Sequence, residues 1–250
     1  PSFTAFNAGT STVTATITVT PTFTSQSIPC TGPTKSFTIT VNPTAQVNQP
    51  NNQVVCNETN TALVDFSSIS TGGTTTYSWA NDTPSIGLAA TGNGNISPFL
   101  ALNSTSNPVT ATITVTPHFE NGSVTCDGPT KSFTITVNPS AQVNQPADIV
   151  VCHYNLTNQV TFTTLSSGGN TTYSWTNDNP SIGLGASGVG DIPAFSAFNN
   201  GTAPVTATIE VTPNFINGTA PCPGVSKTFT ITVNPAGQVN QPANQVICNS

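Results

Sequence analysis

The sequence is short of charged side chains. Only 5% of its 250 residues are charged, with three lysines, no arginine and nine acidic residues, for a formal net charge of −6. Nucleic-acid binding depends on Lys and Arg contacts to phosphates, so this composition excludes nucleic acid as a partner. Catalysis needs ionisable groups that converge, and these are scarce, so we predict no enzyme, no catalytic residues and no cofactor.

Long apolar runs are absent as well. No stretch approaches the roughly 20 apolar residues of a transmembrane helix, so no membrane span is predicted. In place of charge, the chain carries 46 Thr, 28 Asn and 24 Ser to solvate its surface. Hydrophobic residues make up 35% and alternate with polar ones, which indicates packed strands rather than disorder.

The chain repeats itself every 96 residues. The segment SFTITVNPTAQVNQP at 36–50 returns almost unchanged at 132–146 and 228–242. We therefore expect the C-terminal part of one repeat at 1–43, complete repeats at 44–139 and 140–235, and the start of another at 236–250. We expect a chain divided in this way to be a segment of a longer array of repeats.

Within one repeat, alternation of apolar and polar residues predicts short strands. Val109, Ala111, Ile113 and Val115 alternate with threonines, and Phe133, Ile135 and Val137 do the same. The turn signal Asn121-Gly122 lies between them and predicts an antiparallel hairpin. Earlier strands are expected at 53–56, 62–67, 74–80 and 96–102. Six or seven strands in about 96 residues predict an all-β fold, a tandem array of antiparallel immunoglobulin-like sandwiches.

Two tryptophans fit that fold. Trp79 and Trp175 each lie in a YSW strand, and we interpret them as core residues between two sheets, with a ligand-stacking surface as the alternative.

At this point a family resemblance emerges. The pattern VNP…QP…VVCN…YSW…ATITVTP…GPTKSFTITVNP resembles the PKD-like and Ig-like repeats of very large surface proteins of Bacteroidota-type bacteria, and it covers the whole chain. The resemblance implies a secreted or cell-surface protein that acts as a stalk, adhesin or fibre. The sequence departs from the PKD pattern where Asn81-Asp82 and Asn177-Asp178 replace the usual GDG-type turn.

The six cysteines follow the same 96-residue period in two series. One comprises Cys30, Cys126 and Cys222, and the other Cys56, Cys152 and Cys248. No metal-ligand spacing is present, so we expect disulfides in an oxidising compartment and no metal. We favour within-repeat pairs, Cys56–Cys126 and Cys152–Cys222, with Cys30 and Cys248 bonded outside the chain. The alternative spans each junction, as Cys30–Cys56, Cys126–Cys152 and Cys222–Cys248.

Few other residues are candidates for chemistry. Only one position of the repeat is acidic in both complete repeats, and it is occupied by Asp82 and Asp178. We interpret these residues as turn formers, with calcium binding as the alternative. No Ser-His-Asp combination is evident from the pattern. The repeated lysines Lys35, Lys131 and Lys227 each open the last strand. They are expected to protect an exposed edge or, alternatively, to contact a neighbouring filament subunit.

The sequence therefore favours a structural function. We expect a non-catalytic, disulfide-bonded repeat of an extracellular stalk, fibre or filament that associates with copies of itself. The alternative is an adhesin module that binds glycans or a cell surface through its loops.

Overall fold

The computed structural model describes residues 2–218 and 220–249. Two compact units are present, one formed by 1–103 with 109–137 and the other by 104–108 with 138–250. Both are all-β, with a core between two layers, as the sequence predicts.

In the first unit, one sheet has the strand order β5-β10-β8-β6-β7, and β9 pairs with β8. Its strands are β5 (Gln53–Cys56), β6 (Thr74–Asn81), β7 (Thr91–Asn93), β8 (Val109–Asn121), β9 (Val124–Asp127) and β10 (Lys131–Asn138). One turn of 3₁₀-helix, η1 (Pro84–Ile86), follows β6.

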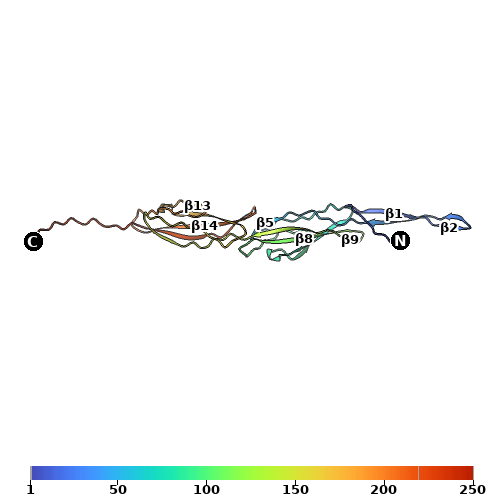
Figure 1. Cartoon of the computed structure of the whole chain (residues 1–250), viewed down its shortest axis with the longest axis horizontal. Helices are drawn as coiled ribbons and strands as arrows, with labels where there is room; N and C mark the ends of the chain where they lie inside the picture. The colour runs from blue at the N-terminus through green and yellow to red at the C-terminus, as the bar shows by residue number, and fades with distance from the viewer. Residues whose placement is uncertain (1, 219, 250) are drawn as a thin grey trace. The chain divides into compact units, whose positions relative to one another are not determined.

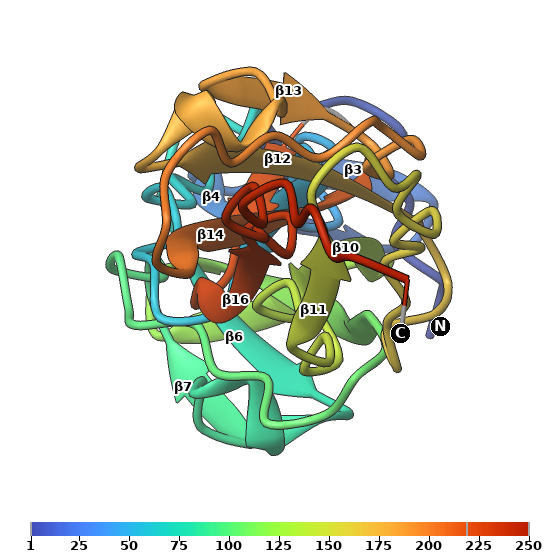
Figure 2. The same cartoon turned by 90° about the vertical axis from the view of Figure 1, so that its left-hand side faces the viewer.

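The second unit repeats this arrangement. Its strands are β11 (Ile149–Cys152), β12 (Asn170–Asn177), β13 (Ser187–Val189), β14 (Val205–Asn217), β15 (Ala220–Pro223) and β16 (Lys227–Asn234), with η2 (Pro180–Ile182) after β12. Strand β11 lies beside β16 at the edge of the sheet (Figure 2). These two strands are parallel, whereas the other pairs are antiparallel.

The expected hairpin is present. β8 and β10 pair from Val109↔Val137 to Val115↔Lys131, so the apolar residues of both strands face the same core. β8 turns into β9 through Gly122 and Ser123, both with φ of 61°. Positive φ at two central residues is what a tight hairpin turn requires, which explains the Asn-Gly signal.

The second layer is less regular than the sequence suggests. The expected strands at 62–67 and 96–102 form isolated bridges, Val64↔Ile96 and Asn60↔Leu100, rather than a continuous ladder. Pro98 lies between the bridges and has no N–H to donate. The Asn95 side chain replaces one ladder bond, because its Oδ1 accepts from the N–H of Phe66 at 2.9 Å.

The N-terminal segment contains four further strands, drawn in blue in Figure 1: β1 (Val13–Val19), β2 (Thr22–Ser25), β3 (Ile28–Thr31) and β4 (Lys35–Val41). β1 and β4 pair from Val13↔Val41 to Val19↔Lys35, the register of β8 and β10 shifted by one repeat. Beyond β16, residues 235–249 run on without secondary structure (Figure 1).

Candidate functional site

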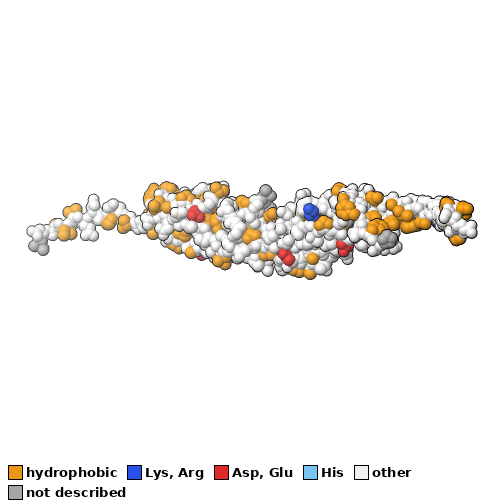
Figure 3. Space-filling view, turned by 45° about the vertical axis from the view of Figure 1, so that its right-hand side comes forward, with side chains coloured by type: hydrophobic (Ala, Val, Ile, Leu, Met, Phe, Trp, Pro, Cys, Tyr) orange, Lys and Arg blue, Asp and Glu red, His pale blue; other side chains and the backbone are white. Residues whose placement is uncertain are grey.

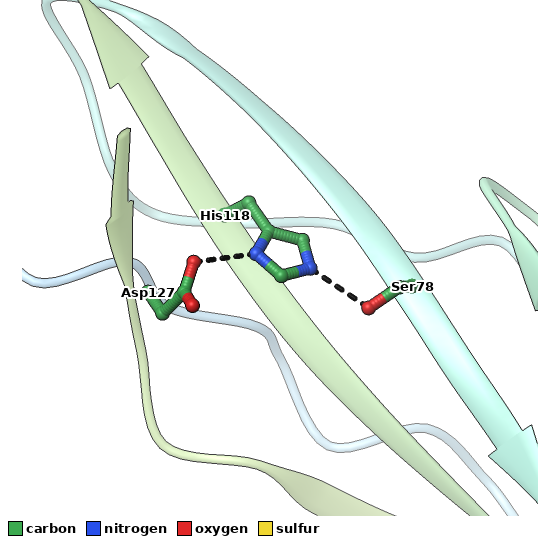
Figure 4. Close-up of polar contacts among 3 residues, drawn as sticks. All are labelled: Ser78, His118 and Asp127. Carbon is green, nitrogen blue, oxygen red and sulfur yellow. Dashed lines mark hydrogen bonds and ion pairs between the residues drawn. The ribbon is translucent and has the colours of Figure 1, made fainter. Parts of the chain in front are cut away.

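A polar cluster joins three strands of the first unit. Nδ1 of His118 on β8 lies 2.6 Å from Oδ1 of Asp127 on β9, and Nε2 lies 2.7 Å from Oγ of Ser78 on β6 (Figure 4). With its proton on Nδ1, the imidazole donates to the carboxylate and accepts from the hydroxyl. The structure thus contains a Ser-His-Asp grouping that is not evident from the sequence pattern.

The surroundings of this cluster do not equip it for acyl transfer. Ser78 is inside β6, between β7 and β8, where ladder hydrogen bonds engage the main chain. An oxyanion needs N–H donors aimed at it, and paired strands do not offer them. The Asp127 side chain is 67% exposed, so its charge is screened. The cluster ties β6, β8 and β9 together.

The second unit lacks the cluster. Ser174 is retained, but Asn214 and Pro223 stand where His118 and Asp127 stand in the first unit. Sequence reasoning missed the grouping because Ser78 and His118 become neighbours only through the register Thr76↔His118 and Ser78↔Thr116.

The cysteines differ from both expected pairings. Cys56 and Cys222 are disulfide-bonded, whereas Cys30, Cys126, Cys152 and Cys248 are free. The within-repeat pairs Cys56–Cys126 and Cys152–Cys222 are therefore not formed, and neither are the three junction pairs.

The strand register of the second unit explains why a within-repeat pair cannot form. Cys152 lies opposite Asn234, at the end of the sheet where Val205 begins β14. Cys222 lies opposite Phe215, ten residues further along β14. At about 3.4 Å per residue the two cysteines are about 34 Å apart, and a disulfide requires Cα atoms within about 7 Å.

The repeated acidic residues tether a turn to the sheet. Oδ1 of Asp82 accepts from the N–H of Thr112 at 2.8 Å and from the hydroxyl of Thr83 at 2.8 Å. The Thr112 hydrogen bond is the main reason why the pKa of Asp82 is lowered. Asp178 accepts from Thr208 in the same way, at 2.7 Å. Among the described residues, no group of three or more His, Cys, Asp or Glu side chains is placed to hold a metal ion.

Both tryptophans lie in the cores of their units. Trp79 and Trp175 are 9% and 6% exposed and pack with the residues of the two hydrophobic clusters. Each indole rests against a glycine of the neighbouring strand, Gly92 or Gly188.

The repeated lysines are exposed. Lys35, Lys131 and Lys227 each begin the last strand of a repeat, opposite Val19, Val115 and Val211. In the described part of the chain, no carboxylate lies within salt-bridge distance of them.

A second repeated polar contact involves asparagines. Asn42, which follows β4, donates from Nδ2 to the carbonyl of Asn121 at 3.2 Å, and Asn121 donates back to its Oδ1 at 2.9 Å. Asn138 and Asn217 make the same reciprocal pair at 2.9 and 3.0 Å. Each pair joins the last strand of one repeat to the hairpin tip of the next.

The N-terminal strands leave an apolar sheet face open. Phe37 on β4 is 53% exposed, whereas its equivalents Phe133 and Phe229 are 2% exposed. Phe23 is likewise exposed, unlike the buried Phe119. Hydrophobic side chains gather over these strands, with few charged ones among them on the face shown in Figure 3.

Solved structures of tandem domains from cadherins and titin match the chain at low sequence identity. Mouse Cadherin-23 EC22-24 matches at 13% identity over 88% of this chain and 74% of that one, with a TM-score of 0.37. Human Protocadherin-24 EC1-2 matches at 11% identity over 79% of this chain and 100% of that one, with a TM-score of 0.38. The I9-I11 tandem from titin matches at 13% identity over 91% of this chain and 94% of that one, with a TM-score of 0.27.

No family model and no curated protein sequence matches the chain. The described residues form no helix with the length and hydropathy of a transmembrane span.

Proposed function

We propose that this chain is a non-catalytic structural part of an extracellular stalk or fibre, built from tandem immunoglobulin-like repeats. The observation that carries the proposal is the reciprocal asparagine pair, which occurs at Asn42–Asn121 and again at Asn138–Asn217. A contact that recurs once per repeat, between the end of one repeat and the hairpin of the next, is what a continuous array needs.

The link between repeats is fixed at a second point. The main chain of Ala45 passes so close to Gly128 that a β-carbon on the glycine would overlap the Ala45 carbonyl, and Ala141 passes Gly224 in the same way. Glycine is required for such a close approach. Together with the asparagine pair, this packing holds the residues that connect one repeat to the next.

The composition supports an extracellular location. Disulfide-bonded Cys56 and Cys222 belong in an oxidising compartment. Hydroxyl and amide side chains in place of charges leave a surface that changes little with salt or pH. We further propose that the chain is exposed at the cell surface and that copies of it associate with one another.

Negative-stain microscopy of the native material tests the proposal. Uniform fibres are expected, and fibre length should be unchanged between about 0.02 and 1 M NaCl because there are few charges to screen. Compact particles at every salt concentration would contradict the proposal.

Adhesion is a second candidate function, favoured by one exposed aromatic group in the second unit. Tyr154 is 68% exposed, and its ring centroid lies 5.6 Å from that of Phe198 and 3.8 Å from that of His153. Exposed aromatic rings are typical of surfaces that stack on sugars. The first unit has Asn57, Glu58 and Leu102 at these positions. Glycan-array binding that is lost in Tyr154→Ala, but retained in Leu156→Ala, would support adhesion; no binding by the unaltered chain would contradict it.

A further inference from the structure

An asparagine that precedes a glycine is the asparagine most prone to lose its side-chain amide. The chain contains four such pairs, which begin at Asn93, Asn121, Asn200 and Asn217. In this reaction the main-chain nitrogen of the glycine attacks Cγ of the asparagine, and ammonia leaves from the side chain. Glycine has no β-carbon to shield its nitrogen, so the attack is unhindered. An asparagine that keeps its amide in front of a glycine is therefore one that the fold restrains.

Two of the four pairs are restrained at the nitrogen that would attack. The N–H of Gly94 donates to the carbonyl of Tyr77 at 2.8 Å, and the N–H of Gly201 donates to Oδ1 of Asn199 at 2.9 Å. An amide nitrogen attacks only after it loses its proton, and a proton engaged in a hydrogen bond is harder to remove. In these two pairs the glycine itself is therefore restrained.

The other two pairs lie at the hairpin tips and are restrained at the asparagine side chain. In the part of the chain that the structure describes, no acceptor takes the N–H of Gly122, which follows the end of β8. Instead, Nδ2 of Asn121 donates to Oδ1 of Asn42 at 2.9 Å. Nδ2 of Asn217 donates to Oδ1 of Asn138 at 3.0 Å in the same way.

The hydrogen bond to Asn42 restrains the carbon atom that would be attacked. Cγ of Asn121 carries Nδ2, so a side chain whose Nδ2 is held does not swing freely toward the nitrogen of Gly122. Ring closure needs the two reacting atoms aligned and within about 3–3.5 Å. Asn42 is itself fixed, because its Nδ2 donates to the carbonyls of Asn121 and Val124 at 3.2 and 3.5 Å.

We infer that the two hairpin tips are modification sites that the asparagine pairs keep unreacted. While Asn42 holds Asn121, and Asn138 holds Asn217, both side chains retain their amides. When the end of one repeat separates from the hairpin of the next, the side chain at the tip is released and its amide is lost. This inference goes beyond the fibre function and does not depend on it, because a single chain contains both pairs.

The released side chain reacts in two steps. The nitrogen of Gly122 forms a bond to Cγ of Asn121, its proton passes to Nδ2, and Nδ2 leaves as ammonia, so that a succinimide ring remains. Water then opens the ring at either of its two carbonyls. The product is aspartate or isoaspartate with one new carboxylate, and water is the only co-reactant.

Renewed contact between the repeats does not reverse this reaction. Aspartate at position 121 has an oxygen in place of Nδ2, so one acceptor would face another, Oδ1 of Asn42. Isoaspartate adds a main-chain carbon next to the tight turn of Gly122 and Ser123, both with φ of 61°. A junction that has once opened is therefore marked permanently.

Peptide mapping by mass spectrometry, after incubation of the whole 250-residue chain at mildly alkaline pH, tests the inference. The folded, unaltered chain should retain the amides of Asn121 and Asn217, and the urea-denatured chain should lose both. In Asn42→Ala, amide loss at Asn121 is expected to rise about tenfold, because one restraining hydrogen bond is gone. Asn217 of the same molecules is the internal control and should be unchanged.

A matched variant separates loss of the restraint from loss of the fold. Asn42→Asp has nearly the same size and keeps an oxygen that accepts from Asn121, so the amide of Asn121 should be retained. Circular dichroism establishes that both variants are folded. Equal amide loss in Asn42→Ala and Asn42→Asp, equal loss at Asn121 and Asn217 in Asn42→Ala, or loss of both amides from the folded, unaltered chain would overturn the inference.

Hydroxylamine identifies the intermediate. It attacks a carbonyl of the succinimide and frees the amino group of Gly122, so the chain is cut after Asn121. Cleavage at this position is expected in Asn42→Ala and not in the folded, unaltered chain. Amide loss without cleavage would overturn the ring-closure step, and neither result bears on the fibre proposal, which microscopy tests.

Discussion

The indole of Trp79 packs against Gly92 so closely that a β-carbon on the glycine would overlap the ring. Trp175 and Gly188 repeat this contact in the second unit. This repeated pairing of the largest side chain with the smallest residue, on neighbouring strands, is how each core accommodates its tryptophan.

Gly92→Ala is therefore expected to destabilise the first unit by about 2–3 kcal/mol, because the added methyl group forces the indole to move in a packed core. Urea denaturation followed by tryptophan fluorescence measures this change. Gly94→Ala is the control: nothing lies within 4 Å of its β-carbon, although its φ is +66°. Left-handed backbone strain alone should cost about 1 kcal/mol there. Equal effects of the two substitutions would show that the indole is not confined.

Trp79→Ala should cost about 3–5 kcal/mol, the usual loss when a large buried aromatic is truncated. The melting temperature of the first unit reports the loss, and the second unit serves as an internal reference. An unchanged melting temperature would mean that Trp79 lies on a surface.

Asp82→Asn should destabilise the first unit at neutral pH. The pKa of Asp82 is lowered in the folded protein by the Thr112 and Thr83 hydrogen bonds, so the ionised form is the one that stabilises. That stabilisation is complete above the unfolded pKa of about 3.9 and is lost as the pH falls through the lower folded pKa. The difference between the two proteins should therefore shrink in acid.

Urea denaturation at pH 7 and at about pH 2.5 measures this difference. Glu120→Gln removes the same charge from an exposed side chain and should have little effect at either pH. A loss in Asp82→Asn that is equal at both pH values would show that the carboxylate charge contributes nothing.

Alkylation should separate the cysteines into two classes. In freshly isolated monomer without added oxidant, iodoacetamide is expected to modify Cys30, Cys126, Cys152 and Cys248, whereas Cys56 and Cys222 remain bonded. Mass spectrometry before and after reduction identifies each site. Protection of Cys126 together with Cys56 would restore the within-repeat pairing that the structure contradicts.

Ser78 should not act as a nucleophile. A fluorophosphonate probe is expected to leave it unlabelled, since the paired strands around it offer no oxyanion donors. His118→Asn introduces the residue that the second unit carries and should alter stability by less than about 1 kcal/mol, as expected for a partly exposed pair. Labelling of Ser78 that depends on His118 would contradict the structural role.

The sequence predicts the features that depend on local pattern. Alternation along 109–115 and 133–137 places the paired strands, and the Asn121-Gly122 signal places the turn. Features that depend on strand register were not predictable in this way. The cysteines of one repeat lie at opposite ends of a sheet because β11 pairs in parallel with β16, a long-range pairing that no local signal marks.

Strand register also explains why the polar cluster could not be predicted from the sequence. Ser78, His118 and Asp127 come from three strands, and only the ladders between β6, β8 and β9 make them neighbours. The regularity of the second layer was overestimated because Pro98 and the Asn95 side chain interrupt its ladder, although the apolar pattern there is that of a strand.

Single-molecule pulling on the 250-residue chain tests the structural function most directly. If the repeats bear load, then after reduction of the disulfide-bonded cysteines Cys56 and Cys222 each complete repeat should unfold as one cooperative event that releases up to about 330 Å of chain, the extended length of its 96 residues. Two such events of equal length are expected, each requiring measurable force. Smooth extension without discrete events would contradict the assignment of this chain to a load-bearing stalk or fibre.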